Sequence, residues 1–390
     1  MKALHIITGL GVGGAEQQLR LLLRHLPVDC DVVTLTNPGP VAESLTADGV
    51  RVIHLGMSGN RDLSALPRLV RLIRSGRYDL VHTHLYRACV YGRIAARLAG
   101  VRAVVATEHS LGGRQLEGRA LTAGVRALYL ASEQLGHVTV AVSPTVADRL
   151  RRWGVPEPRI EVVPNGIDVA RFRFDPVSRE HTRRRLGLPQ DAYVVGGIGR
   201  LTAGKRFGVL IGALARLPRD YRLLLVGGGP EENVLRRTAQ RAGVTDRVLF
   251  TGERPYDADG TRGLDLPSLT SAMDVLASPS PEEAFGLAVV EGLAAGLPVL
   301  YASCPAIDDL PPGLTTVTRR VTGGPDAFAH ALAETRALTW AGRSHPPPRP
   351  VSAAARHYCI TRSAAQLMNV YAAAVSCSPP SRPPLGVTDR

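Results

Sequence analysis

The stretch DVLASPSPEEAFGLAVVEGLAAGLPVLYAS, residues 274–303, predicts a complete strand–helix–strand unit. Apolar runs at 274–280 and 298–303 are typical of buried strands. Between them, Phe285 to Ala295 has a helical pattern that Gly296 and Pro298 end. Two strands joined by a helix indicate a parallel pair, because parallel strands need a long crossover connection.

The same alternation of strands and helices extends in both directions from this stretch, which favours an α/β fold with doubly wound parallel sheets. At 390 residues, of which 45% are hydrophobic, the chain is long enough for two such domains. The strands expected in the first half are 3–8, 31–36, 51–55, 79–84, 102–107, 138–142 and 160–163. Those expected in the second half are 193–199, 222–229, 247–253, 274–280 and 298–303.

The domain boundaries follow from breaks in this rhythm. A Pro-Asn-Gly turn in VVPNGID (162–168) closes the first half, so we expect an N-terminal domain over 1–168 and a second domain over 190–345. An amphipathic pattern then predicts a helix within 352–376. The Pro-rich end, 378–390, is expected to be disordered.

Charge and cysteine content narrow the class of protein. The net charge of +13 favours an anionic partner. It is divided evenly, +6 over 1–170 and +7 over 171–390, without a dense basic and aromatic patch, so nucleic acid is not the expected partner. Five cysteines without a C-x-x-C pair indicate a reducing compartment, and no apolar run reaches about 18 residues, so we expect a cytoplasmic protein.

Two glutamates in the opening stretch are the strongest candidates for a binding site. Glu283 follows a strand and Glu291 lies eight residues later on the predicted helix, while the free amides of Phe285, Gly286 and Leu287 would face an anion. Carboxylates bind hydroxyl groups, so we expect one of these glutamates to bind the hydroxyls of a sugar and the other to bind those of a ribose. Solvated charge at a helix start would explain Glu282 but explains Glu291 poorly.

Positive and glycine-rich positions at other strand ends point to phosphate. Arg200 and Lys205 follow the first strand of the second half, and Lys205 is one of only two lysines in the chain. An arginine fork with a lysine point charge suits a diphosphate. Gly14 opens the first helix, whose amides can meet an anion, although a tight turn is the other interpretation. A dinucleotide site is disfavoured because the second strand ends at Asn37, not at an acidic residue.

No metal or other cofactor is expected. Asp29-Cys30-Asp31 and Asp257-Ala258-Asp259 match D-x-D, but turn-forming aspartate explains both. His82 and His84 alternate on one strand and are therefore expected to face opposite sides and not to share a metal. At the strand end, His84 would reach the acceptor side of a cleft or pack in the core.

Taken together, GGAE (13–16), VHTHLY (81–86), VVPNGID, GRL (199–201) with Lys205, GGGP (227–230) and SPEEAFGLAVVEGLAAGLPVL (280–300) resemble the retaining glycosyltransferases of family 4. The resemblance covers about residues 2–300 and the last helix. It implies a GT-B fold: two Rossmann-like domains that face a central cleft, with a C-terminal helix that crosses back to the first domain.

The resemblance also implies roles for single residues. Arg200 and Lys205 would hold the diphosphate of a UDP- or GDP-sugar, Glu291 its ribose and Glu283 the donor sugar. Gly14 would contact the phosphate or the sugar, and His109 would act beside the sugar as the catalytic residue. The departing diphosphate would take the acceptor proton. Ala284 stands where the family commonly has glycine, and ASCPAIDDL (302–310) departs from its usual acidic loop.

The acceptor is left open by the sequence: a sugar, a lipid-linked sugar or a small molecule, in envelope, exopolysaccharide, glycolipid or glycosylated natural-product synthesis. Five arginines around one first-half helix suit an anionic membrane face, and a solvated helix face explains them equally well. They are Arg61, Arg68, Arg71, Arg74 and Arg77. The alternative enzyme activity is that of a nucleotide-sugar epimerase or a phosphorylase. The remaining alternative is a nucleic-acid-binding protein.

Overall fold

The computed structural model describes residues 1–59, 62–112, 115–116, 119–120, 122–254, 264–312, 314, 317–340 and 349–377. The predicted disordered tail at 378–390 and the Asp257-Ala258-Asp259 motif lie outside these residues. The chain forms two compact units. The first contains Met1–Gly11, Leu22–Val163 and the chain from Ser363 onward, and the second contains Val12–Leu21 and Pro164–Arg362.

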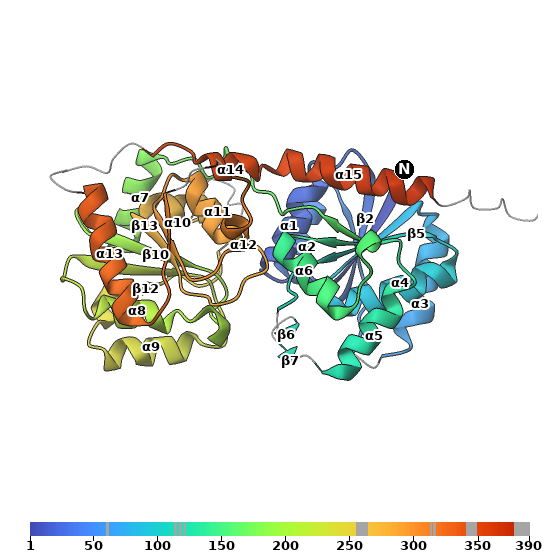
Figure 1. Cartoon of the computed structure of the whole chain (residues 1–390), viewed down its shortest axis with the longest axis horizontal. Helices are drawn as coiled ribbons and strands as arrows, with labels where there is room; N and C mark the ends of the chain where they lie inside the picture. The colour runs from blue at the N-terminus through green and yellow to red at the C-terminus, as the bar shows by residue number, and fades with distance from the viewer. Residues whose placement is uncertain are drawn as a thin grey trace, which may run out of the picture. The chain divides into compact units, whose positions relative to one another are not determined.

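The first unit is built on a parallel sheet of seven strands in the order β3-β2-β1-β4-β5-β8-β9 (Figure 1). These strands are β1 (Lys2–Gly9), β2 (Asp29–Asn37), β3 (Arg51–His54), β4 (Leu80–His84), β5 (Ala103–Glu108), β8 (Val138–Ala141) and β9 (Ile160–Val162). Alternate residues of β1 point to opposite faces, so Leu4 and Ile6 enter a core with α3 and α4 while His5 enters the other face.

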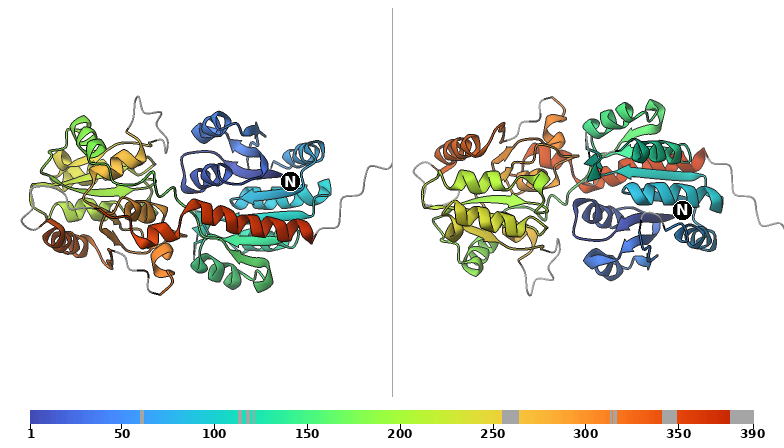
Figure 2. Two further views of the ribbon diagram at one scale, coloured as in Figure 1. Left: turned by 90° about the horizontal axis from the view of Figure 1, so that it is seen from above. Right: turned by 90° about the horizontal axis from the view of Figure 1, so that it is seen from below.

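Helices connect these strands as the parallel arrangement requires. They are α2 (Gly39–Ala47), α3 (Ala65–Gly76), α4 (Tyr86–Ala99), α5 (Ala123–Glu133) and α6 (Pro144–Trp153), with α15 (Ile360–Ser376) closing the unit. Both views of Figure 2 show α15 running along this unit. A short hairpin of β6 (Gln115–Leu116) and β7 (Arg119–Ala120) was not expected from the sequence.

The second unit is built on a parallel sheet of six strands in the order β12-β11-β10-β13-β14-β15. They are β10 (Tyr193–Ile198), β11 (Tyr221–Val226), β12 (Val248–Phe250), β13 (Val275–Ser278), β14 (Val299–Tyr301) and β15 (Thr318–Arg320). Its helices are α7 (Pro176–Leu186), α8 (Gly208–Leu214), α9 (Glu232–Arg241), α10 (Leu266–Ala272), α11 (Leu287–Ala294), α12 (Pro305–Asp308), α13 (Pro325–Trp340) and α14 (Ala353–His357). The two parallel sheets confirm the predicted α/β class.

A buried charge cluster anchors the outer layer of the second unit. Asp274, immediately before β13, accepts hydrogen bonds from Arg179 (2.6 Å) and Arg183 (2.7 Å) of α7 and from Arg349 (3.2 Å). The backbone amide of Val194 also donates to Asp274, at 2.7 Å. Because one buried carboxylate faces three guanidinium groups, the cluster ties α7 to the amino ends of the central strands β10 and β13. The carboxyl ends of these strands are left free for a site.

Candidate active site

Two of the predicted donor residues meet at the carboxyl ends of neighbouring strands. Lys205 ends a short 3-10 turn after β10, and Glu283 lies in the loop after β13, which pairs with β10. The ammonium Nζ of Lys205 is 2.6 Å from Oε1 of Glu283, with the side chains 32% and 14% exposed. In doubly wound sheets ligands bind at this edge, so the ion pair lies where a ligand is expected.

Glycines let two loops run close together beside this ion pair. A Cβ atom on Gly227 would lie 2.0 Å from the carbonyl oxygen of Gly199, and one on Gly229 would lie 2.4 Å from that of Leu201. The amide of Leu201 donates to the carbonyl of Gly228 at 2.8 Å. The GGGP motif therefore supports the loop that carries Arg200, whose side chain is exposed.

Ser280 is a residue that sequence reasoning missed. Its buried hydroxyl donates to the carbonyl of Glu282 at 2.9 Å and lies 3.5 Å from the carbonyl of Gly204. It therefore joins the loop of Glu283 to the loop of Lys205. A small polar residue between Pro279 and Pro281 was the signal that could have found it.

The helix after this loop starts later than its pattern predicted. Helix α11 begins at Leu287, because Gly286 adopts a left-handed conformation (φ 102°) that ends the preceding loop. A Cβ atom on Gly286 would lie 2.4 Å from Sγ of Cys304. Phe285 is in the core, with its ring edge against Tyr358 at a centroid distance of 5.0 Å. Phe285 thus positions the loop, and its side chain is not available to a ligand.

Glu291 lies within α11 and is 6% exposed. Burial raises its pKa from 4.5 to about 8, because desolvation penalises the carboxylate. A protonated carboxyl both donates and accepts hydrogen bonds, as a pair of ribose hydroxyls would require. Gly14, at the start of α1 (Gly14–Leu23), belongs to the same unit by its contacts: a Cβ atom there would lie 3.3 Å from Cδ1 of Leu287.

In the first unit, His109 follows β5 and lies beside His84, with Nε2 of His109 3.1 Å from Nδ1 of His84. Nε2 of His84 is 3.1 Å from Nδ1 of His5. His84 is 1% exposed and both its ring nitrogens face histidines, so it has no nitrogen left for an acceptor. The interpretation of His84 as an acceptor-side contact is therefore replaced by a packed position behind His109.

The expectation that His82 and His84 face opposite sides was wrong. Residues two apart on a strand point to the same face, and the two rings lie 4.1 Å apart. Within the described part of the chain, His5, His82 and His84 form the one group whose nitrogens lie close enough to suggest a metal site, all within 4.8 Å. Burial lowers the pKa of His5 to about 3 and that of His109 to about 4, so both rings are neutral at pH 7.

The first D-x-D motif has a structural role. Asp31, in β2, accepts a hydrogen bond from the Tyr78 hydroxyl at 2.6 Å and pairs with Lys2 at 3.4 Å. These contacts hold the strand start, away from the carboxyl edge of the sheet. The second motif, at Asp257 and Asp259, lies outside the described residues.

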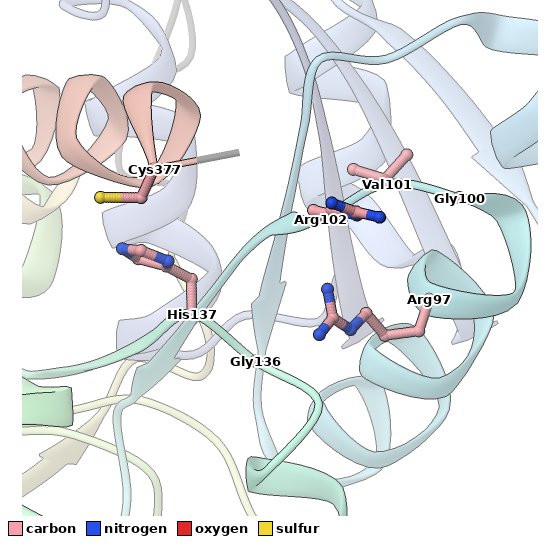
Figure 3. A pocket seen from close by; sticks show the side chains of 7 residues that line it. All are labelled: Arg97, Gly100, Val101, Arg102, Gly136, His137 and Cys377. Atoms are coloured by element: carbon pink, nitrogen blue, oxygen red, sulfur yellow. The ribbon is translucent and has the colours of Figure 1, made fainter. Parts of the chain in front are cut away.

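A cavity of about 620 Å³ lies at the opposite edge of the first sheet. It is lined by Arg97, Arg102, His137 and Cys377, among others (Figure 3). Arg102 and His137 immediately precede β5 and β8, so the cavity is at the amino ends of the strands. Ligands of parallel sheets bind at the carboxyl ends, so this cavity is not the candidate active site.

The exposed face of α3 carries Arg68, Arg71 and Arg74, while Leu69, Val70 and Ile73 are buried beneath it. Arg74 donates to the carbonyl of Leu98 at 2.6 Å. Arg61, which the membrane-face expectation included, lies outside the described residues. Among the helices that the structure describes, none has the length and hydropathy that crossing a membrane requires.

Solved structures identify the fold. Anabaena HepE, solved in complex with UDP and glucose, superposes with a TM-score of 0.80 at 21% identity and covers 96% of this chain and 100% of its own. Two parallel-sheet α/β units of this kind are the GT-B fold, as predicted.

The family is identified by sequence. The Glycosyltransferase Family 4 model matches residues 12–171 and the Glycosyl transferases group 1 model matches residues 178–310. The D-inositol 3-phosphate glycosyltransferase of Salinispora tropica is 32% identical over 86% of this chain and 75% of its own length. The 2-deoxystreptamine glucosyltransferase of Streptomyces kanamyceticus is 31% identical over 70% and 75%. The chain belongs to family 4 of the glycosyltransferases and is a glycosyltransferase.

Proposed function

We propose that this enzyme transfers a sugar from a UDP-sugar to a hydroxyl group of a cyclitol, with retention of the anomeric configuration. The observation that carries the proposal is the Lys205–Glu283 pair (2.6 Å) at the strand ends of the second unit, within one loop of the Gly286 turn that starts α11. A cation, an anion and free helix amides in one place suit a diphosphate joined to a polyhydroxy sugar.

The donor and acceptor classes are supported by the relatives. HepE was solved with UDP and glucose, which favours UDP among the possible nucleotides. The names of the two relatives specify inositol phosphate and 2-deoxystreptamine, both cyclitols. An acceptor with a phosphate or other anionic group would be favoured by the net charge of +13.

In the proposed reaction, the bond from the anomeric carbon to the diphosphate oxygen breaks and a bond to the acceptor oxygen forms on the same face of the sugar. The acceptor proton passes to the departing phosphate oxygen. Arg200 and Lys205 stabilise the charge that develops on the leaving group. Glu283 and Glu291 bind sugar and ribose hydroxyls, and the neutral His109 hydrogen-bonds the transferred sugar. Because Arg200 and Lys205 supply the positive charge that the leaving diphosphate requires, we propose that no metal is required.

A two-stage assay tests the proposal. Thermal shift with UDP-, GDP- and ADP-sugars should select a UDP-sugar, and that donor should then be consumed with an inositol phosphate or an aminocyclitol. Proton NMR of the product should show the anomeric configuration of the donor. Inversion would refute retention. Turnover only with a lipid-linked sugar would show that the acceptor is in a membrane and not a cyclitol, and would support membrane contact by the arginines of α3. Epimerisation of the donor without any acceptor would support the epimerase alternative.

A further inference from the structure

Six side chains in the first unit form one hydrogen-bonded row, which we call the histidine chain. Its links, in order, are Thr107 Oγ1 to His82 Nε2 (2.7 Å), His82 Nδ1 to Tyr371 Oη (2.6 Å), Tyr371 Oη to His5 Nε2 (3.5 Å), His5 Nδ1 to His84 Nε2 (3.1 Å) and His84 Nδ1 to His109 Nε2 (3.1 Å). The free end is Nδ1 of His109, which is buried and has no hydrogen-bond partner in the described part of the protein.

Strand register brings these residues together. His5 of β1 is opposite His82 of β4, and His84 of β4 is opposite Thr107 of β5. All of them point to the face of the sheet that α15 covers, and Tyr371 of α15 enters the row from there. The row therefore starts at Thr107, level with His84, passes beneath the C-terminal helix at Tyr371 and ends at His109, just past the carboxyl end of β5.

Each histidine in the row is neutral. Burial lowers the pKa of all four rings below the ordinary value of 6.5, because a charged imidazolium would be desolvated there. A neutral imidazole donates with one nitrogen and accepts with the other. The direction of one hydrogen bond in the row therefore fixes the direction of the next.

Counting protons decides the direction. The six groups carry six exchangeable protons, one each, for five links, so one proton stays unpaired: at Thr107, at His109, or at the buried Tyr371 if its hydroxyl oxygen accepts from both neighbouring rings. At Thr107 it would stay unpaired inside the core, because His82 is the only partner of that hydroxyl among the described residues. At Nδ1 of His109 it lies at the end of the row just past β5, where an oxygen of the bound sugar in the proposed reaction would accept it. A buried donor without a partner is destabilising, so the arrangement that leaves the unpaired proton at His109 is favoured.

We propose that the histidine chain holds His109 as the tautomer protonated at Nδ1, so that this residue donates a hydrogen bond to an oxygen of the bound sugar. Tyr371, on the last helix, is then a positioning residue that acts through His5 and His84. The inference about the sugar rests on the proposed function, whereas the tautomer of His109 is measured separately, on the protein itself.

Nitrogen-15 NMR of histidine-labelled full-length protein tests the tautomer directly. In the wild type, long-range correlations should show His109 with a protonated Nδ1 and a bare Nε2, its signals being assigned with His109→Asn. In Tyr371→Phe, three histidines with three protons and two links remain, so either end can hold the unpaired proton and His109 should show both tautomers. Tyr129→Phe is the matched control, since it removes a buried hydroxyl that bonds Arg93 outside the row.

Activity provides the second measurement. Tyr371→Phe should lower kcat by about three- to tenfold, the value of one hydrogen bond, and should have no further effect in a His109→Ala background. Three results would each overturn the proposal. They are a bare Nδ1 on His109 in the wild type, an unchanged tautomer in Tyr371→Phe, and stoichiometric zinc bound by His5, His82 and His84. If no sugar nucleotide is turned over but the tautomer behaves as described, only the proposed function fails.

Discussion

Replacement of Lys205 by alanine separates a binding role from a structural one. The ammonium lies 2.6 Å from Glu283, but the lysine side chain is 32% exposed, so the ion pair contributes at most about 1 kcal/mol to folding. That value corresponds to a decrease in Tm of about 2–4 °C. A charge-assisted hydrogen bond to phosphate is worth about 1.5–3 kcal/mol. Because about 1.4 kcal/mol corresponds to a tenfold change in rate, loss of this bond should lower kcat/KM by about tenfold to hundredfold.

The measurement is kcat/KM with the selected sugar nucleotide, together with the affinity for UDP by calorimetry and the Tm. Arg237→Ala, at an exposed arginine of α9, is the control for loss of one charge. Lys205→Arg should recover only part of the activity, since a planar fork does not replace a compact ammonium. Glu283→Gln breaks the same ion pair but keeps the lysine, so its affinity for UDP should stay near that of the wild type. Near-normal turnover of Lys205→Ala would refute the placement of this lysine on the diphosphate.

Four other predictions concern metal, pH, backbone and buried charge. Transfer activity should withstand excess EDTA; a loss that Mn²⁺ or Mg²⁺ reverses would show a metal requirement. Because the pKa of Glu291 is about 8 folded and 4.5 unfolded, the folded state binds more protons between these values and stability falls as pH rises. The free energy of unfolding, measured in urea as a function of pH, should fall by up to about 1.4 kcal/mol per pH unit in the wild type and should lack this slope in Glu291→Gln. Parallel pH curves for the two proteins would contradict the prediction. Gly286→Ala should lose at least about 1–2 kcal/mol of unfolding free energy from its φ of 102° alone, and wild-type stability would count against strain there. Asp274→Asn should lose about 3–5 kcal/mol, because three buried guanidinium groups lose their carboxylate; a loss below 1 kcal/mol would show that other groups compensate.

The fold was accessible from the sequence because each buried strand is a local apolar run. The strands that were predicted too long, such as 222–229, extend into glycines: β11 ends at Val226, and the GGGP loop that follows has a separate role. The predicted start of α11 was early by two residues, because the pattern of apolar residues does not record that Gly286 takes a left-handed conformation.

Long-range contacts account for what the sequence could not show. Asp274 meets arginines 91 and 95 residues earlier in the chain, and no local pattern marks such a pair. The histidines on β4 were visible, but their two-residue spacing was misinterpreted, and the partner Tyr371 is 289 residues from His82. The predicted contacts of Arg200, Lys205, Glu283, Glu291 and His109 with a donor stay predictions until a complex is tested.

The discontinuity of the first unit has a consequence for biosynthesis. Its sheet is complete at β9, yet Tyr371 and the rest of α15 are translated about two hundred residues later, after the whole second unit. Until then, the face with His5 and His82 lacks its cover, and a ribosome-bound chain must keep it from other hydrophobic surfaces. The enzyme therefore acquires its complete first unit only after the whole second unit has been synthesised, and a chain truncated before Tyr371 would emerge with both sheets but an open histidine face.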